Sequence, residues 1–555
     1  MNSPLLSIEQ LSVTFNHQQK VVDDISFAVY SGETFALVGE SGSGKSITAL
    51  SVLRLLPPGA RLNAGKISLR SDNLLSRSEL DLCKIRGKRI GMIFQDPMSS
   101  LNPVMTIGSQ IEEVIKIHFS LSGPGLRQRV LALLQQVEIP EPEQRINDYP
   151  HQLSGGQRQR VMIAIALAGK PDLLIADEPT TSLDVTIQAQ ILRLLKNLQE
   201  QTGMALWLIS HDLALVSTLA DRVAVMQRGK IVETGATAEF FNHPRHTYTR
   251  KLLNALPSID SAGRNLINHG SAREKPPLLQ VKDFYCYYPL RKGIFKRIVD
   301  YVRAVDGVSF DIPKGRTLAL VGESGCGKTT LGKGLLNLIP ASGGQVKIDG
   351  VELNSLSGEL LRQKRADIQI VFQDPFSSMN PRMLVGDIID EGIRALHPEV
   401  SRTDRKARVS QLLQQVGLPE DSAQRYPHEF SGGQRQRICI ARALAVDPKL
   451  IVCDEPTSAL DVSVQAQIID LLKLLQREKG VSYLFITHDI AVVAEIADEV
   501  AVMYRGKIIE HGSARQVLTQ PEHAYTRKLL EAVPVLKANP PCSIDGLNRK
   551  EGFEN

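Results

Sequence analysis

The chain has 555 residues, of which 43% are hydrophobic and 23% charged, and its formal net charge is +5. This length corresponds to several globular domains, and so small a charge permits a nucleic acid or an anionic membrane as partner without arguing for either. No apolar run reaches the ~20 residues of a membrane-spanning helix, and we expect no secretory signal. The six cysteines lie too far apart for the paired spacing of zinc or redox sites, which favours a reducing cytosol.

The most informative feature is an internal repeat, which must be recognised before the fold can be assigned. Five motifs occur twice in the same order, 277 to 283 positions apart. In the first copy they read GESGSGKS, FQDPMSSLNP, LSGGQRQR, LLIADEPT and LISHD. We therefore predict two domains, 1–257 and 278–536. A polar, proline-ended linker (258–277) joins them and a disordered tail (537–555) follows.

The first motif in each copy follows a short apolar run and precedes a helical pattern, which predicts a buried strand, a glycine-rich loop and a helix. It fits the P-loop pattern, in which Lys45 or Lys328 reaches the β- and γ-phosphates and the hydroxyl of Ser46 or Thr329 binds Mg²⁺. A glycine turn that only ends a strand is the alternative, and recurrence at the same relative place makes it negligible. The remaining loop residues predicted to bind phosphate are Gly39, Ser41, Gly42, Gly44, Gly322, Ser324, Gly325 and Gly327.

The second P-loop contains Cys326 where the first has Ser43. A thiol at a helix N-terminus beside Lys328 is expected to have a lowered pKa and to react readily. The alternative is that Cys326 is only a small, enclosed residue, as Ser43 is.

The third motif places a serine and two glycines before a helical pattern. Ser at an N-cap leaves N–H groups at the positive helix end, which predicts a second anion site. An ordinary helix cap would be the better interpretation without the P-loops. The residues concerned are Ser154, Gly155, Gly156 and Gln157 in the first copy, and Ser431, Gly432, Gly433 and Gln434 in the second.

The fourth motif is an apolar strand that ends in Asp-Glu, at Asp177-Glu178 and again at Asp454-Glu455. The aspartate suits a Mg²⁺ shell and the glutamate can polarise an attacking water, since phosphoryl transfer requires positioning and charge stabilisation. A solvated acidic pair at a strand end is the alternative, which the upstream P-loops disfavour.

These motifs, with a histidine 33 positions after each glutamate, resemble the nucleotide-binding domain of ABC ATPases over residues 5–536. The resemblance implies an α/β fold with two tandem P-loop NTPase domains, each with a RecA-like core, an antiparallel β subdomain and a helical subdomain. It also implies that the two domains dimerise within the chain and sandwich ATP and Mg²⁺ head to tail, each P-loop facing the other copy's SGGQ.

The same resemblance assigns roles to further residues. Those expected at Mg²⁺ and the attacking water are Gln95 and Gln373, those at the γ-phosphate are His211 and His488, and those crossing the domain interface are Asp184 and Asp461. Phe15 and Tyr288, ten residues into each copy, are expected to stack on adenine, and a core aromatic is the alternative. For the histidines the alternative is a satisfied core imidazole.

The motifs FQDPxSSxNP and YPHxxSGGQRQR resemble those of the peptide/opine/nickel uptake family of bacterial ABC transporters. Here two ATPase subunits look fused, as in glutathione-type and microcin-C-type importers. Its turn residues predict an exposed loop, which the resemblance assigns to permease docking. The implied partners are two integral membrane permeases and, indirectly, an extracytoplasmic solute-binding protein, at the cytoplasmic face of the inner membrane. We expect no nucleic acid and, lacking the four cysteines of some relatives, no iron–sulfur cluster. A basic insertion, 289–305, is either a solvated hairpin or a contact with lipid or permease.

Two rival functions remain at this stage. A soluble tandem cassette acting on ribosomes usually has a long, charged linker, whereas about 20 residues separate the copies here. A DNA-repair cassette would require zinc-binding cysteine pairs. Neither rival accounts for FQDPxSSxNP.

Overall fold

The computed structural model describes residues 3–16, 19–181, 183–255, 276–292, 297–458 and 460–533. The predicted tail, and the predicted linker apart from its last two residues, lie outside this part of the chain. The chain divides into two compact units, one mainly of residues before 255 and the other mainly of residues after 276. Within the described residues, no helix combines the length and apolar character needed to span a bilayer.

The first unit is built on two sheets. A four-stranded antiparallel sheet has the order β2-β1-β4-β5, made of β1 (Leu6–Phe15), β2 (Gln19–Val29), β4 (Ala60–Leu69) and β5 (Asp72–Asn73). A six-stranded sheet has the order β10-β9-β3-β8-β7-β6, made of β3 (Thr34–Val38), β6 (Ile90–Ile93), β7 (Leu173–Asp177), β8 (Ala205–Ser210), β9 (Arg222–Gln227) and β10 (Lys230–Ala236). In the six-stranded sheet only β10 runs antiparallel to its neighbour.

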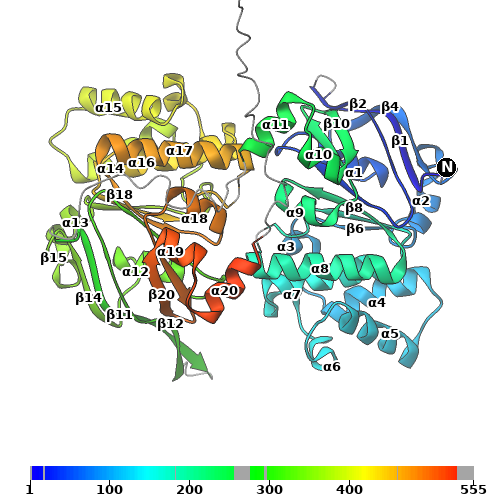
Figure 1. The fold of residues 1–555 in the computed structure, drawn as a ribbon, viewed down its shortest axis with the longest axis horizontal. Coiled ribbons are helices and arrows are strands. Elements are labelled where there is room, and N and C mark those ends of the chain that lie inside the picture. Colours follow the sequence, from blue (N-terminus) through cyan, green and yellow to red (C-terminus); the bar gives the residue numbers. More distant parts are fainter. Residues whose placement is uncertain are drawn as a thin grey trace, which may run out of the picture. The chain divides into compact units, whose positions relative to one another are not determined.

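The helices of the first unit lie around its six-stranded sheet, and two of them form the end opposite the antiparallel sheet. Figure 1 shows α4 and α5 at the end away from β1 and β2, with the six-stranded sheet between them. The helices are α1 (Lys45–Val52), α2 (Glu79–Ile85), α3 (Pro97–Ser100), α4 (Ile107–His118), α5 (Gly123–Gln136), α6 (Pro142–Arg145), α7 (Gly155–Leu167), α8 (Val185–Thr202), α9 (Leu213–Leu219), α10 (Thr237–Asn242) and α11 (Thr247–Asn254).

The second unit repeats this architecture. Its antiparallel sheet has the order β12-β11-β14-β15, made of β11 (Leu279–Lys292), β12 (Arg297–Ile312), β14 (Gly343–Ile348) and β15 (Val351–Glu352). Its larger sheet has the order β16-β17-β18-β13-β19-β20, made of β13 (Thr317–Val321), β16 (Ile368–Val371), β17 (Leu450–Asp454), β18 (Ser482–Ile486), β19 (Glu499–Tyr504) and β20 (Lys507–Ser513). The helices are α12 (Lys328–Leu335), α13 (Gly358–Lys364), α14 (Val385–Leu396), α15 (Arg402–Gln415), α16 (Gly432–Leu444), α17 (Val462–Lys479), α18 (Ile490–Ile496), α19 (Ala514–Thr519) and α20 (Ala524–Glu531).

The strands that lead to the repeated motifs are fully buried in both units. Every residue of β3, β7 and β8 is buried, as is every residue of β13, β17 and β18. Near-continuous apolar runs of this kind are typical of parallel strands covered on both faces. The P-loops, the Asp-Glu pairs and the histidines therefore stand at the ends of fully buried strands.

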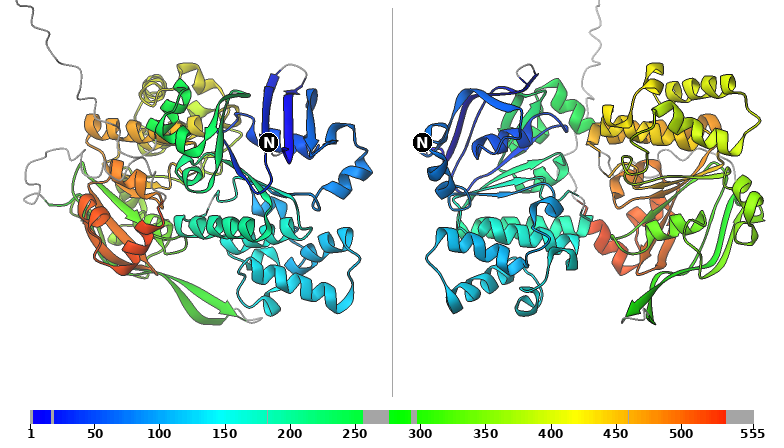
Figure 2. Two further views of the ribbon diagram at one scale, coloured as in Figure 1. Left: turned by 45° about the vertical axis from the view of Figure 1, so that its right-hand side comes forward. Right: turned by 180° about the vertical axis from the view of Figure 1, so that it is seen from behind.

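The basic insertion of the second copy is a two-stranded ribbon. Strand β11 pairs with β12 out to Lys292 and Arg297, whereas the matching hairpin of the first copy closes at Phe15 and Gln19. Figure 2 shows this green ribbon projecting from its sheet. Its apolar side chains are 43 to 55% exposed at Leu290, Ile298, Val299, Tyr301 and Val302. The hairpin expected here is thus present and exposed, while its contact with lipid or permease stays a prediction.

The cores of the two units differ at one pair of contacting positions, where a larger side chain in one element is matched by a smaller one in the other. Phe284 of β11 is fully buried against Gly334 of α12, and a Cβ at Gly334 would lie 2.8 Å from its Cζ atom. At the equivalent places the first copy has the smaller Leu11 and the larger Ser51, both buried. The second copy has therefore accommodated an aromatic ring by removing a side chain.

We predict that Gly334→Ser destabilises the second unit by about 1–3 kcal/mol through overpacking. Adding Phe284→Leu should recover much of the loss, because the pair is coupled. Urea unfolding can separate the units, since the sole tryptophan, Trp207, is buried in the first. The circular dichroism transition should shift while the Trp207 fluorescence transition stays; a shared shift would show that the units unfold together.

Candidate active site

The P-loop of each unit is held by close approach to a neighbouring strand. Gly39 has φ of 153°, and a Cβ there would lie 2.2 Å from the carbonyl oxygen of Met226 in β9. Gly44 has φ of 106°, and a Cβ would meet the carbonyl of Val21 at 2.5 Å. Only glycine fits these two positions. The loop thus lies flat against the ends of β2 and β9, directly before helix α1.

The P-loop lysine closes its own loop. Lys45 Nζ donates to the carbonyl oxygens of Gly39 and Glu40 at 2.8 and 2.9 Å. In the second unit Lys328 Nζ donates to Gly322 and Glu323 at 2.7 and 2.9 Å. Both ammonium groups are held at the mouth of a helix N-terminus, where a phosphate is favoured.

A hydroxyl and a buried carboxylate meet beside each P-loop. Ser46 Oγ donates to Asp177 Oδ1 at 3.0 Å, and Thr329 Oγ1 donates to Asp454 Oδ1 at 3.0 Å. Burial raises the pKa of Asp177 to about 6, against the hydrogen bond from Ser46, and burial likewise raises the pKa of Asp454. Hydroxyl and carboxylate oxygens are ligands that Mg²⁺ prefers, and a cation would offset the desolvated charge. The residues present therefore fit Mg²⁺.

The carboxylate of Glu178 lies at the centre of a network. Gln95 Nε2 and Thr181 Oγ1 each donate to its Oε2 atom at 2.9 Å, and His211 Nδ1 lies 3.2 Å from Oε1. Burial alone would raise the pKa of Glu178, but the hydrogen bond and charge of His211 together with Thr181 lower it to about 2. Glu178 is therefore ionised at neutral pH.

The second unit repeats this network with one difference. Gln373 Nε2 donates to Glu455 Oε2 at 2.9 Å, and His488 Nδ1 lies 3.3 Å from Oε1. Burial opposes ionisation, yet His488 lowers the pKa of Glu455 and Glu455 in turn raises that of His488. Ser458 donates to the main-chain carbonyl of Glu455 at 3.2 Å, whereas Thr181 reaches the carboxylate of Glu178.

Both glutamates are held in a left-handed backbone conformation, with φ of 46° at Glu178 and 47° at Glu455. A non-glycine residue in this region costs of order 1–3 kcal/mol and persists only where its surroundings fix it. Such strain is concentrated at functional sites. It aims each carboxylate at the glutamine and histidine from other loops.

The serine of each SGGQ motif is the N-cap of its helix, as predicted, and the structure adds a capping box with the glutamine. Ser431 Oγ accepts from the N–H of Gln434 while Gln434 Oε1 accepts from the N–H of Ser431, and Ser154 and Gln157 do the same. The first N–H groups of a helix have no partner within it. A Cβ at Gly433 would lie 2.3 Å from Val464 Cγ1, whereas one at Gly432 would meet only Leu460 at 3.6 Å. Gly433 is thus required for packing and Gly432 is not.

The remaining predicted residues take positions at element ends. Phe15 is the last residue of β1, and Tyr288 lies on β11 with 39% of its surface exposed, so Tyr288 is not a core aromatic. Asp184 immediately precedes α8, and Asp461 is the N-cap of α17. The P-loop residues Ser41 and Ser324 lie between strand and helix, in the exposed turn.

The expectation of a lowered pKa for Cys326 is wrong. Burial raises the pKa of its thiol, and this exceeds the lowering effect of Lys328, whose Nζ lies 3.8 Å from Sγ. Only 7% of the residue is exposed. Cys326 therefore acts as a small packing residue, the alternative that Ser43 had suggested.

Sequence reasoning missed one pair of residues beside the P-loops. The N–H of Glu40 donates to Tyr248 Oη at 3.4 Å, and the N–H of Glu323 donates to Tyr525 Oη at 3.1 Å. The stretches HTYTRKLL and HAYTRKLL, 277 positions apart, are a further repeated motif that could have signalled them.

This arrangement of P-loop, acidic strand end and paired glutamine and histidine defines a nucleotide-hydrolysing P-loop ATPase. The family described as ABC transporter matches residues 22–181 and 305–458, and the family described as oligopeptide/dipeptide transporter, C-terminal region, matches 232–289 and 509–549. The chain belongs to the ABC transporter family, has its two α/β cassettes in tandem, and is an ATP-binding ATPase.

Full-length relatives share this organisation. The chain is 50% identical to the peptidoglycan transport ATP-binding protein YejF of Agrobacterium fabrum, over 95% of this chain and 96% of that protein. It is 48% identical to the glutathione import ATP-binding protein GsiA of Escherichia coli and of Salmonella typhimurium, over 96% of this chain and 90% of each. Both cassettes are therefore covered in a single alignment.

We predict that Mg²⁺-dependent nucleotide binding weakens as the pH falls through about 6. Asp177 is ionised above that pH and protonated below it, and a metal ligand must be deprotonated. At about one pH unit below, the affinity for Mg²⁺ should fall roughly tenfold. Fluorescent ATP titrated with Mg²⁺ measures this, and the variant Asp177→Asn/Asp454→Asn corrects for protonation of the nucleotide. A parent whose pH dependence equals that of this variant contradicts the role of Asp177.

Proposed function

We propose that this chain powers the import of peptides or peptide-like solutes into a bacterial cell. It is the energy-coupling ATPase of an ABC importer. The observation that carries the proposal is that each complete catalytic network is followed by an oligopeptide/dipeptide transporter C-terminal region. Two relatives that are similar to this chain over almost its whole length are named for the transport of peptidoglycan and the import of glutathione. Both of these solutes contain peptide.

The geometry of the network suggests how hydrolysis is controlled. With a pKa of about 2, Glu178 is charged but weakly basic, because the hydrogen bond and charge of His211, with Thr181, outweigh its burial. A general base is most effective with a pKa near the working pH. His211 turning from the glutamate to the γ-phosphate would raise the basicity of Glu178 as ATP arrives. The carboxylate would then accept a proton from the attacking water.

The proposed nucleotide contacts follow from the same loops. The P-loop N–H groups with Lys45 and Lys328 bind the phosphates, and the rings of Phe15 and Tyr288 stack on adenine. Bound Mg²⁺ would neutralise phosphate charge. The groups proposed to hold it are Ser46, Gln95 and Asp177 in the first unit, and Thr329, Gln373 and Asp454 in the second.

We further propose that the two copies complete one another's sites, and that the domains are 1–257 and 278–536 with the linker 258–277. A phosphate bound by its P-loop has one open side, and a helix N-terminus such as that of α16 can close it. The first site would join Lys45 with Ser431 and Gly432, and the second would join Lys328 with Ser154. Asp184 and Asp461 would cross between the copies.

The proposed partners are two integral membrane permeases, with a solute-binding protein acting through them, so that the chain is peripheral to the cytoplasmic face of the inner membrane. Phe376, 47% exposed, lies in the FQDPFSSMNP stretch, where Met379 is buried and anchors the loop. In the other copy α3 occupies the same stretch, with Leu101 as anchor. Two anchored, exposed loops fit two permease subunits. The alternative, a soluble cassette acting on ribosomes or nucleic acid, does not use them.

We predict that Glu178→Gln combined with Glu455→Gln lowers ATP turnover at least ~10²-fold, as expected for loss of a general base. Nucleotide should stay bound, because Gln keeps the shape and the contact with Gln95 and Gln373. Turnover is measured by phosphate release, and retention by nucleotide content after gel filtration. Turnover within about threefold of the parent would show that another group is the base.

The same trapped variant tests the biological role. Purified from detergent-solubilised cells, it should bring down two integral membrane proteins in equal amounts. Copurifying rRNA or DNA without membrane proteins would favour the soluble alternative. The FQDP loops offer the control, since Phe376→Asp should weaken the capture of one permease relative to the other while ATP binding remains.

We predict that Gly432→Asp disables the site built on Lys45. A carboxylate there repels the γ-phosphate by about 4 kcal/mol at ~4 Å and an effective dielectric of about 20. Gly432→Ala is the matched control, since a Cβ has room at this position. Steady-state ATPase should lose little more when Lys45→Ala is added, and nearly everything when Lys328→Ala is added. The reverse pattern would mean that each copy works in cis.

A further inference from the structure

We propose that Tyr248 and Tyr525 are positioning residues for ATP, through which the C-terminal region of each copy holds the P-loop in its binding conformation. The proposal rests on the proposed role of the P-loops in binding ATP. It starts from the hydrogen bonds of Glu40 N–H to Tyr248 Oη and of Glu323 N–H to Tyr525 Oη.

The tyrosine and the P-loop lysine hold one residue from opposite sides. Glu40 gives its N–H to Tyr248 and its carbonyl to Lys45 Nζ, and Glu323 is held in the same way by Tyr525 and Lys328. When ATP draws the ammonium toward its phosphates, the contact with the carbonyl weakens. The contact with the tyrosine then remains, together with the N–H of Ser43, which donates to the Glu40 carbonyl at 3.1 Å.

The tyrosine is itself fixed by a chain of hydrogen bonds. Glu233 of β10 accepts the N–H groups of Arg245 and His246 at 2.8 and 3.0 Å, and His246 Nδ1 accepts the N–H of Tyr248 at 3.2 Å. This chain turns the peptide into α11 with the ring of Tyr248 facing inward, where it is 7% exposed. The P-loop packs against β9, and the neighbouring strand β10 fixes the tyrosine.

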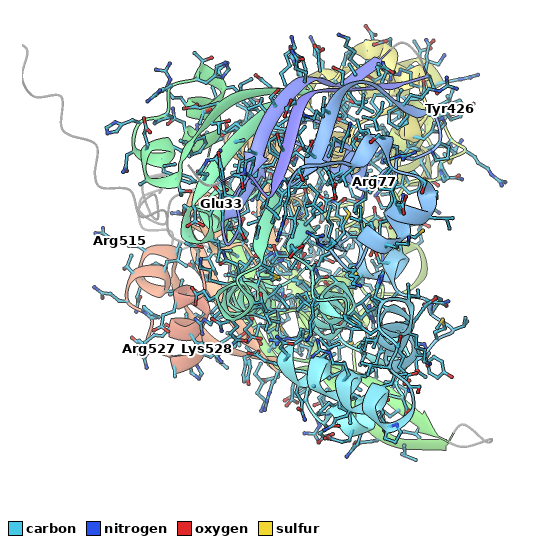
Figure 3. The ribbon with its side chains drawn as sticks, turned by 90° about the vertical axis from the view of Figure 1, so that its right-hand side faces the viewer. Glu33, Arg77, Tyr426, Arg515, Arg527 and Lys528 are labelled. Atoms are coloured by element: carbon cyan, nitrogen blue, oxygen red, sulfur yellow. The ribbon has the colours of Figure 1, made fainter. Side chains whose placement is uncertain are left out.

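The second unit repeats every link. Glu510 of β20 accepts the N–H groups of Glu522 and His523 at 2.8 and 3.1 Å, and His523 Nδ1 accepts the N–H of Tyr525 at 3.1 Å. Two copies that differ elsewhere have kept the whole chain of contacts. Arg527 and Lys528 of α20 are exposed and labelled in Figure 3, whereas Tyr525 is half-buried.

The electrostatics suit a permanent neutral acceptor. Burial raises the pKa of Tyr525 above its ordinary value, so its hydroxyl stays protonated throughout the physiological range. A neutral phenol beside the P-loop accepts an N–H without adding negative charge next to ATP. A carboxylate in its place would repel the phosphates.

The test removes one oxygen atom from each tyrosine in the full-length protein. Tyr248→Phe should weaken ATP binding by about three- to tenfold, the effect of losing one neutral hydrogen bond, and raise KM for ATP with kcat unchanged. The same substitution at Tyr525 should act on the other site. Fluorescent ATP titrations in the Lys328→Ala background measure the first site, and those in the Lys45→Ala background measure the second.

Tyr504→Phe is the matched control. Its ring lies 4.4 Å from that of Tyr525, but no described hydrogen bond joins its hydroxyl to the P-loop. It should leave both affinities unchanged, and all three variants should keep the melting temperature of the nucleotide-free protein. Hydrogen exchange adds an independent readout, because ATP should slow exchange in α11 of the parent but not of Tyr248→Phe.

The outcomes separate the two proposals. Parental ATP affinity in both tyrosine variants, or an equal loss in Tyr504→Phe, overturns the positioning role. A loss of melting temperature with unchanged KM makes the tyrosine purely structural and also overturns it. If Lys45→Ala/Lys328→Ala binds ATP like the parent, the proposed site itself is wrong.

Discussion

The close packing of each P-loop against the neighbouring strand is the constraint on which the rest of the site depends. The carbonyl of Met226 lies only 2.2 Å from where a Cβ of Gly39 would stand, so the loop can approach the sheet this closely only with glycine at this position. This fixes the start of α1, and with it Lys45 and Ser46. The position of Ser46 in turn sets where Asp177 must end its strand. A close contact between main chains thus helps to position three chemically distinct groups, an ammonium, a hydroxyl and a carboxylate.

The sequence predicted the parts of this site that depend only on residues close together in the chain. The glycines, Lys45, Asp177 and the SGGQ caps follow from short patterns whose physics is contained in a strand, a loop and a helix end. What it could not predict is how strongly distant groups act on one another. The lowered pKa of Glu178 depends on His211 and Thr181 meeting one carboxylate. The raised pKa of Cys326 depends on burial, which the positive helix end beside it does not overcome.

Tyr248 shows the same limit more sharply. It lies 208 positions from Glu40, and no local pattern connects a tyrosine near the start of a helix with a P-loop. Only the repeat of HxYTRKLL in both halves distinguishes it from an ordinary buried aromatic. The contact that links the exchange of Leu11 for Phe284 with that of Ser51 for Gly334 is also seen only in the structure. Divergence between the copies has altered packing in pairs while leaving the chemistry around both P-loops alike.

The order of strands in the larger sheet has a consequence for how the protein is made. Thr34 of β3 pairs with Leu206 of β8, 172 positions later, and the other neighbour, β9, comes later still. At a synthesis rate of about 5–20 residues per second, β3 must wait roughly ten to thirty seconds for its partners. The second copy then presents TLALV where the first presented TFALV. Folding of the first copy before β13 leaves the ribosome would therefore protect the chain from pairing the wrong strands.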